Sequence, residues 1–180
     1  MSNELVYGDA SKFVNELTAA DAEAREYFDS VVTYLSACVK SVSTFREGAS
    51  SAHPVPSDAW VLNIETGDGQ FKLASRFATL SLVCSFPLGT IRYLLSEATG
   101  PIADFHPGRL EGFLTFTGKD TGKKTESADK KSSAKIYAGE GTLPTGWKID
   151  SPAGFAEPLF HQLFEPLPVE VPRANAGGKP

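Results

Sequence analysis

The residue types that could bind a metal or transfer a proton recur near the C-terminus. Glu157, His161 and Glu165 are four residues apart, so a helix would place two carboxylates and an imidazole in one stripe. A carboxylate beside an imidazole raises its basicity, and the pair could share a metal ion. A structural metal site takes about four ligands, however, and this stripe offers fewer. We therefore predict a solvated helix face, with no metal and no cofactor.

The cysteines Cys38 and Cys84 offer a second kind of chemistry, that of a thiolate nucleophile beside a histidine. Cys84 could meet His106 or His161 only in the folded chain, because such pairs form in space rather than in sequence. Both cysteines have apolar neighbours, which predicts buried, reduced thiols rather than a disulfide. Together with an N-terminus that lacks a secretory pattern, this predicts a cytoplasmic protein or a component of an assembly made inside a cell.

The segment 118–125 has the composition of a phosphate-binding loop but not its spacing. Three residues rather than four separate Gly118 from Gly122, and Lys124 rather than a hydroxyl residue follows Lys123. No helix is predicted after the segment to place its N-terminus against a phosphate. Since no other set of catalytic residue types converges in the sequence, we predict that the protein is not an enzyme.

Positive charge is concentrated in residues 119–135, which have a net charge of +3 in a chain of net charge -5. Residues 118–133 contain no Val, Ile, Leu or aromatic residue, which predicts a mobile hairpin loop. Aromatic residues on the flanking strands could stack on bases beside these lysines, so single-stranded nucleic acid is one candidate ligand. The candidate residues are Lys119, Lys123, Lys124, Lys130, Lys131, Lys135, Phe113, Phe116 and Tyr137.

A long amphipathic helix is the strongest structural prediction. Apolar residues recur at steps of three and four from residue 14 to residue 45, which is the period of a helix. Thr18 followed by Asp21 is typical of a helix start, so we expect a short helix over 10–17 and a main helix over 19–46. The heptad-like stripe must be covered, either by the chain's own sheet or by a second copy.

Strands are predicted where apolar residues alternate with polar ones. Glycines predict a hairpin turn at 66–69, and a change of face predicts a bulge or break at 75–77. Helical spacing predicts a short helix over 90–98. The predicted strands are 60–65, with one half-buried face, 71–86, 109–117 and 134–138. These elements predict an α+β fold, in which the N-terminal helix packs on an antiparallel sheet of about five strands in a domain spanning 1–150.

The proline-rich segment 151–180 is predicted to be a C-terminal arm, with a short helix over 157–164 and disorder from about residue 173. Its apolar residues would dock onto the chain's own body or onto a neighbour. These candidate partner-binding residues are Phe155, Leu159, Phe160, Leu163 and Phe164.

We therefore predict a non-catalytic macromolecular interaction protein, such as an adaptor, inhibitor, chaperone or assembly component, that acts through its apolar helix and its arm. A protein partner is expected, and a homo-oligomer and nucleic acid are open alternatives. A third hypothesis is a small-ligand pocket or an active site between the helix and the sheet. The longest apolar run, 77–88, is too short and too polar to cross a membrane, so no membrane contact is predicted.

Overall fold

The fold is seen in a computed structural model that describes residues 4–49, 61–85, 89–97, 109–118, 134–138 and 147–164. It is α+β, with one long N-terminal helix, an antiparallel sheet and a short second helix, as predicted from the sequence. The helices are α1 (Glu4–Ala49) and α2 (Pro152–Gln162). The strands are β1 (Asn63–Gly67), β2 (Gln70–Ala74), β3 (Ala78–Ser85), β4 (Thr90–Glu97), β5 (Arg109–Thr115) and β6 (Lys135–Ala138).

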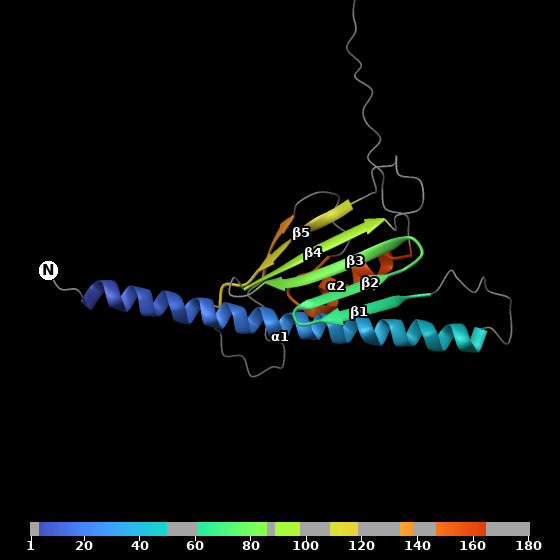
Figure 1. The fold of residues 1–180 in the computed structure, drawn as a ribbon, viewed down its shortest axis with the longest axis horizontal. Helices are drawn as coiled ribbons and strands as arrows, with labels where there is room; N and C mark the ends of the chain where they lie inside the picture. The colour runs from blue at the N-terminus through green and yellow to red at the C-terminus, as the bar shows by residue number, and fades with distance from the viewer. Residues whose placement is uncertain are drawn as a thin grey trace, which may run out of the picture.

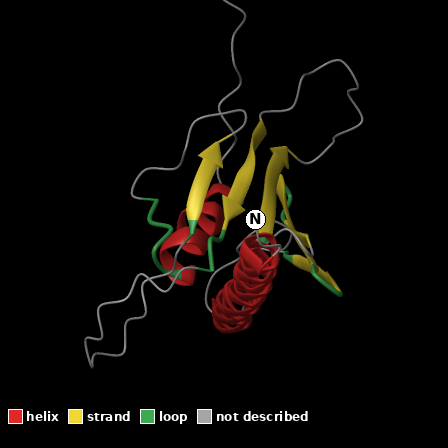
Figure 2. Ribbon diagram, turned by 90° about the vertical axis from the view of Figure 1, so that its left-hand side faces the viewer, coloured by secondary structure: helices red, strands yellow, loops and turns green. Residues whose placement is uncertain are grey.

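The six strands pair in chain order, each antiparallel to the next. Both helices lie on the same side of this sheet, so the described part of the molecule has two layers (Figure 2). One face of the sheet therefore packs on helices, while none of the described helices covers the other face. An antiparallel sheet with one solvated face is common, because its strands alternate inward and outward side chains.

The N-terminal segment forms one helix of 46 residues rather than the two predicted (Figure 1). Its length is about 69 Å at 1.5 Å per residue. Thr18 does not cap a new helix, because its hydroxyl donates a hydrogen bond to the carbonyl of Val14, one turn earlier, at 2.9 Å. A threonine in the interior of a helix commonly makes this bond, whereas a capping threonine would accept from the backbone further on.

The predicted helix over 90–98 is wrong, because Thr90–Glu97 is strand β4. Its eight residues pair with β3 on one side and seven of them pair with β5 on the other. Ile91, Tyr93 and Leu95 are buried at two-residue spacing, whereas Ile91, Leu94 and Leu95 had suggested a helical face. A short apolar segment fits both periods, and here pairing on both edges decides for the strand.

The predicted turn and break are both present, but the first strand is less buried than expected. Gly69, with φ of 66°, closes the β1–β2 hairpin. The break at 75–77 is a turn in which the Ser75 hydroxyl accepts from the backbone of Phe77 and Ala78, at 3.0 Å each. Trp60 lies outside the described residues, and Ile64 is 38% exposed on the edge strand β1. Leu62, just before β1, packs against the core, so the half-buried face predicted for residues 60–65 is confirmed only at that residue.

Helix α2 begins at Pro152 instead of near residue 157. The Ser151 side chain accepts from the backbone of Gly154 and Pro152 follows it, which is a favoured combination at a helix start. Pro158 therefore lies inside the helix, where it cannot donate to the carbonyl of Gly154. That carbonyl accepts from the backbone of Lys148 at 3.3 Å, so the helix continues through the proline.

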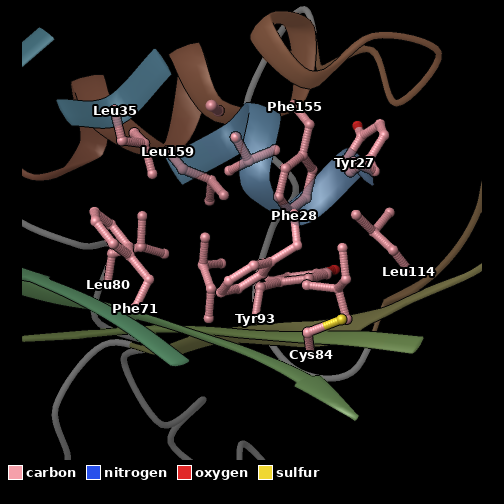
Figure 3. Packing of buried hydrophobic residues seen from close by; sticks show 14 of the residues in the cluster. Tyr27, Phe28, Leu35, Phe71, Leu80, Cys84, Tyr93, Leu114, Phe155 and Leu159 are labelled. Atoms are coloured by element: carbon pink, nitrogen blue, oxygen red, sulfur yellow. The ribbon is translucent and has the colours of Figure 1, made fainter. Parts of the chain in front are cut away.

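A single core fills the space between the helices and the sheet (Figure 3). Aromatic side chains from both layers meet at its centre. The ring of Tyr93 on β4 lies 5.7 Å from that of Phe155 on α2, and Tyr27 on α1 lies 6.1 Å from Phe155. Trp147 stacks on Phe155 at 5.3 Å. One aromatic cluster thus joins strand β4 to both helices.

Two glycines let the sheet approach α1 at Ala20. Gly89 and Gly118 have positive φ values of 54° and 62°, which favour glycine over other residues. A Cβ at Gly118 would lie 2.6 Å from the backbone nitrogen of Ala20 and from the carbonyl oxygen of Glu16. A Cβ at Gly89 would lie 2.9 Å from that of Ala20. The sheet therefore begins to cover α1 near Ala20.

Candidate binding surface

The apolar residues predicted to bind a partner through the C-terminal arm lie in the chain's own core. Phe155, Leu159 and Leu163 have no exposed surface, while Phe160 and Phe164 are partly buried. The rings of Phe160 and Phe164 meet edge to face, 5.4 Å apart. The arm therefore docks in cis as far as residue 164, and its three most buried side chains are not accessible to another molecule in this arrangement. Residues 165–180 lie outside the described residues.

Specific hydrogen bonds fix the start of α2 to the rest of the core. The Tyr27 hydroxyl on α1 lies 3.1 Å from the carbonyls of both Ile149 and Ser151, and the Trp147 indole donates to the carbonyl of Phe155 at 2.9 Å. Burial raises the pKa of the Tyr27 hydroxyl well above its usual range, and the charge of Asp150 adds to this effect. These bonds fix the start of α2 to α1 and to the core, so the apolar side of α2 is occupied by the chain itself.

The open face of the sheet carries a row of three side chains that face away from the core. Arg92 on β4, Phe113 on β5 and Tyr137 on β6 are directly opposite one another in the register. Phe113 is 47% exposed and Tyr137 is 59% exposed, which is unusual for residues that bury large apolar areas. We call these three residues the aromatic row.

The surroundings of the aromatic row are polar and carry both signs of charge. The guanidinium of Arg92 lies 3.5 Å from the carboxylate of Glu111. Near the opposite edge of the sheet, the ammonium group of Lys72 lies 3.3 Å from the carboxylate of Glu65. Such exposed pairs contribute little to stability but hold the side chains over the sheet. Lys135 is exposed on β6, opposite Thr115. The hydroxyl residues with partial exposure on this face are Thr79, Ser81, Ser85, Thr90, Ser96 and Thr115.

The structure separates the residues predicted to bind nucleic acid. Phe113 and Tyr137 share the open face, and Lys135 lies on the same strand as Tyr137. Phe116 does not join them, because it is only 3% exposed and its ring packs 5.2 Å from that of Tyr27. Phe116 comes three positions after Phe113, and an odd step along an extended chain turns its side chain to the opposite face, toward the core. Lys119, Lys123, Lys124, Lys130 and Lys131 lie outside the described residues.

The two thiols lack the environment of a nucleophile. Burial raises the pKa of Cys84 to about 11, and the charge of Asp21 adds to this effect. Burial also raises the pKa of Cys38, although a hydrogen bond from Tyr34 opposes the shift. A reactive cysteine needs a lowered pKa, so both thiols stay protonated near neutral pH. His106, one of the proposed partners of Cys84, lies outside the described residues.

The predicted acid–imidazole stripe is present only in part. Glu157 and His161 are exposed on α2, and Glu165 lies outside the described residues. Among the described residues, no group of three or more His, Cys, Asp or Glu side chains could hold a metal ion. The space between helix and sheet, where a ligand pocket was considered, is filled by core side chains (Figure 3). A shallow hollow lies instead on α1, lined by Glu26, Asp29, Ser30, Thr33 and Tyr34.

Sequence reasoning missed Arg92, because it assigned that residue to a helix. The two-residue alternation of Ile91, Tyr93 and Leu95 was the signal that could have placed it on a strand. It also missed Phe13, which continues the apolar stripe of α1 at the N-terminal side of Leu17.

No family model, curated protein or solved structure matches this chain. In the described part of the chain, neither helix combines the length and the apolar character needed to span a bilayer.

Proposed function

We propose that this protein is a non-catalytic macromolecular interaction protein and that it binds through the open face of its sheet. The observation that carries the proposal is the contrast between the two faces. One face is filled by two helices of the same chain, and the other presents Arg92, Phe113 and Tyr137 in one row. Exposed apolar surface rimmed by polar residues marks sites of interaction.

The residue types of the aromatic row support binding. Tyrosine and arginine are enriched among the residues that dominate binding energy at interfaces, and aromatic side chains are enriched at interface centres. Adjacent strands lie about 4.8 Å apart, so the row extends over roughly 10 Å. A rigid sheet holds these side chains in place, and little conformational entropy is lost when a partner covers them.

This binding surface lies on the sheet and not on the C-terminal arm, where the sequence had predicted it. Phe155, Leu159 and Leu163 already fill the core, so exposing them would require undocking α2. The two free thiols support the cytoplasmic location expected from the sequence, because reduced cysteines are usual there.

A comparison of three immobilised proteins tests this function in extract of the native host. They are the wild type, the double variant Phe113→Ser with Tyr137→Ser, and the control Val61→Ser. Val61 is also an exposed apolar residue, at 36%, but lies just before the edge strand β1. We expect at least one macromolecule to be retained by the wild type and the control and lost from the double variant. Identical recovery on all three proteins would refute binding at the open face.

A second candidate function, binding of single-stranded nucleic acid, is favoured by the position of the basic segment. Residues 119–135, with a net charge of +3, connect β5 to β6, the two strands that carry Phe113 and Tyr137. Stacking of one base on an exposed aromatic ring contributes about 1–3 kcal/mol, and lysines that contact phosphate make binding depend on salt.

Fluorescence anisotropy with labelled oligo(dT) and oligo(U) tests this second function. We expect binding that weakens from low to moderate salt, that is weakened by Lys135→Glu and that is lost in Tyr137→Ser. Tyr137→Phe keeps the ring and is the matched control, so it should bind as the wild type does. Negligible anisotropy change at both salt concentrations would exclude this function.

A further inference from the structure

Strand β5 has a glycine where its inner face should carry a buried side chain. Leu110 and Leu114, two residues to either side of Gly112, are both buried in the core. Gly112 does not have a positive φ, so the backbone conformation does not require a glycine there. A glycine inside a strand weakens it and often marks a place where another group approaches the backbone closely. The requirement at residue 112 is therefore for space.

The side chain of Tyr93 on β4 takes that space. Tyr93 is opposite Gly112 in the register, and a Cβ at residue 112 would lie 2.2 Å from the tyrosine hydroxyl oxygen and 2.6 Å from its Cζ. The same Cβ would lie 2.4 Å from the backbone carbonyl oxygen of Tyr137 on β6. The Tyr93 side chain thus crosses the core side of β5 and ends near the backbone of β6.

The core holds the ring of Tyr93 in this position. The rings of Trp147 and Phe155 meet it edge to face, at centroid distances of 5.1 Å and 5.7 Å. Figure 3 shows Tyr93 lying along the sheet, with Phe155 above it on the helix side. Because both neighbouring rings belong to the layer that packs on the sheet, they keep the tyrosine ring against Gly112.

The hydroxyl of Tyr93 does not hold the side chain in place. Tyr93 is fully buried, and its hydroxyl has no hydrogen-bond partner among the described residues. Burial alone raises the pKa of Tyr93 to about 12. An unpaired buried hydroxyl costs free energy, so phenylalanine would serve the core at least as well. The ring, rather than the hydroxyl, is what residue 93 contributes at Gly112.

We propose that Tyr93 and Gly112 are positioning residues for the aromatic row. The ring fills the gap that the glycine leaves and sets how closely β6 lies against β5, which keeps Tyr137 beside Phe113. An aromatic residue opposite a glycine is one of the means by which strand register is fixed. The inference rests on the function proposed for the open face, because it names the buried residues that keep that site in shape.

Strand β6 depends on this support because it is short and is paired on one side. It has four residues, and among the described strands only β5 pairs with it. Gly112 is opposite Ala138, the residue that follows Tyr137. A change at residue 93 or 112 should therefore loosen β6 before it loosens the central strands.

Two NMR measurements on the full chain test the positioning role without any partner. They are the nuclear Overhauser effects between the side chains of Phe113 and Tyr137, and amide exchange in β6 relative to β3. Tyr93→Leu leaves the gap at Gly112 open, so the Overhauser effects should be lost and the relative exchange should become about tenfold faster. Tyr93→Phe keeps the ring and should behave as the wild type does in both measurements.

Leu95→Ala is the matched control for a general loss of core packing. Leu95 is as buried as Tyr93 and lies on the same face of β4, but it is opposite Leu110 instead of Gly112. This variant should lose stability, keep the Overhauser effects and show no selective exchange in β6.

Gly112→Ala tests the same gap from the other strand. Its Cβ would press on Tyr93 and on the carbonyl of Tyr137, so it should also separate Tyr137 from Phe113. This variant decides the question if Tyr93→Leu does not fold. Unchanged Overhauser effects and exchange in the variants that fold would overturn the inference. So would selective opening of β6 in Leu95→Ala, or a wild type without these Overhauser effects.

Capture from extract of the native host separates this inference from the proposed function. The macromolecule that the wild type retains should also be retained by Tyr93→Phe and Leu95→Ala and lost from Tyr93→Leu and Gly112→Ala. Its retention by the last two variants would overturn their role at the binding site. If the wild type retains nothing, the proposed function fails, and the NMR measurements still decide whether Tyr93 and Gly112 position β6.

Discussion

The middle and the N-terminal end of α1 share one apolar stripe but have opposite environments. Ala24, Val31 and Leu35 in the middle are at most 1% exposed, beneath the sheet and beside α2. Phe13 and Val14, on the same helix, are more than half exposed. The period of apolar residues thus determines which side of the helix is apolar, but the extent of the sheet determines how much of that side is covered.

The two regions also differ in side-chain size. At the boundary α1 presents the small residue Ala20, which lets the glycine turns at Gly89 and Gly118 approach its backbone. The N-terminal end presents the larger Phe13, which is 61% exposed. Substitutions in the middle should therefore affect folding much more than substitutions at the N-terminal end.

The largest effect is expected for Leu35→Ala in the middle of the helix. Leu35 has no exposed surface and lies in the core near Leu159 (Figure 3). The variant should lose about 2–5 kcal/mol in free energy of unfolding, because a cavity replaces the buried side chain. Urea unfolding measures this loss. A loss below about 1 kcal/mol would show that this part of α1 is not firmly packed.

A smaller loss is expected for Gly118→Ala, at the boundary between the two regions. Alanine is strained at a positive φ, and its Cβ would press on the backbone of α1 at Ala20. We expect a loss of about 1–3 kcal/mol in free energy of unfolding. Gly67→Ala is the control, because a Cβ there meets its nearest neighbour at an ordinary 3.8 Å. Equal stability of the two variants would contradict the close approach at the boundary.

Burial of Cys84 in the covered region should also make the free energy of unfolding depend on pH in the alkaline range. Burial beneath α1 raises the pKa of Cys84 from 9.0 to about 11. Between pH 9 and pH 11 the unfolded thiol is ionised and the folded thiol is still protonated, so stability falls as pH rises through this range. Burial raises the pKa of Tyr93 to about 12, which extends the decline at higher pH.

Urea unfolding across this range, with Cys84→Ala as the test variant, measures the contribution of Cys84. The variant should lose less stability than the wild type as the pH rises from 9 to 11. An identical decline in the two proteins would mean that Cys84 titrates normally and is not buried beneath α1.

The smallest effect on folding is expected for Phe13→Ser at the N-terminal end of α1. Its side chain is 61% exposed, so the free energy of unfolding should change by less than about 0.5 kcal/mol. Thermal and urea unfolding measure this change. If Phe13→Ser destabilised the protein as much as Leu35→Ala, the N-terminal end of α1 would be covered by the chain's own residues, and the contrast between the two regions would fail.

Local pattern predicted much of the fold. The stripe of α1, the hairpin turn at Gly69 and the inward face of β5 all follow from the spacing of apolar residues and glycines. The two-residue alternation along β5 also turns Phe113 to the face opposite Leu114, so the outward position of this member of the aromatic row follows from local spacing. These features depend on neighbours within a few residues, which is the range over which a sequence pattern acts.

Features that depend on distant partners were missed. The segment 90–97 has both a helical and a strand period, and only pairing with β3 and β5 selects the strand. Pro158 was placed at a helix start, because nothing local shows that the backbone of Lys148 would bond the carbonyl of Gly154. Arg92 could join Phe113 and Tyr137 only after β4 was recognised.

The sequence by itself determined which residues alternate, which side of α1 is apolar and where the chain turns, because these depend on side-chain type and local spacing. The tertiary structure alone decided that α2 packs in cis, that both described helices lie on the same face of the sheet and that α1 extends past the described strands. Those outcomes depend on how much apolar area each layer can cover, a quantity that exists only once distant segments have been brought together.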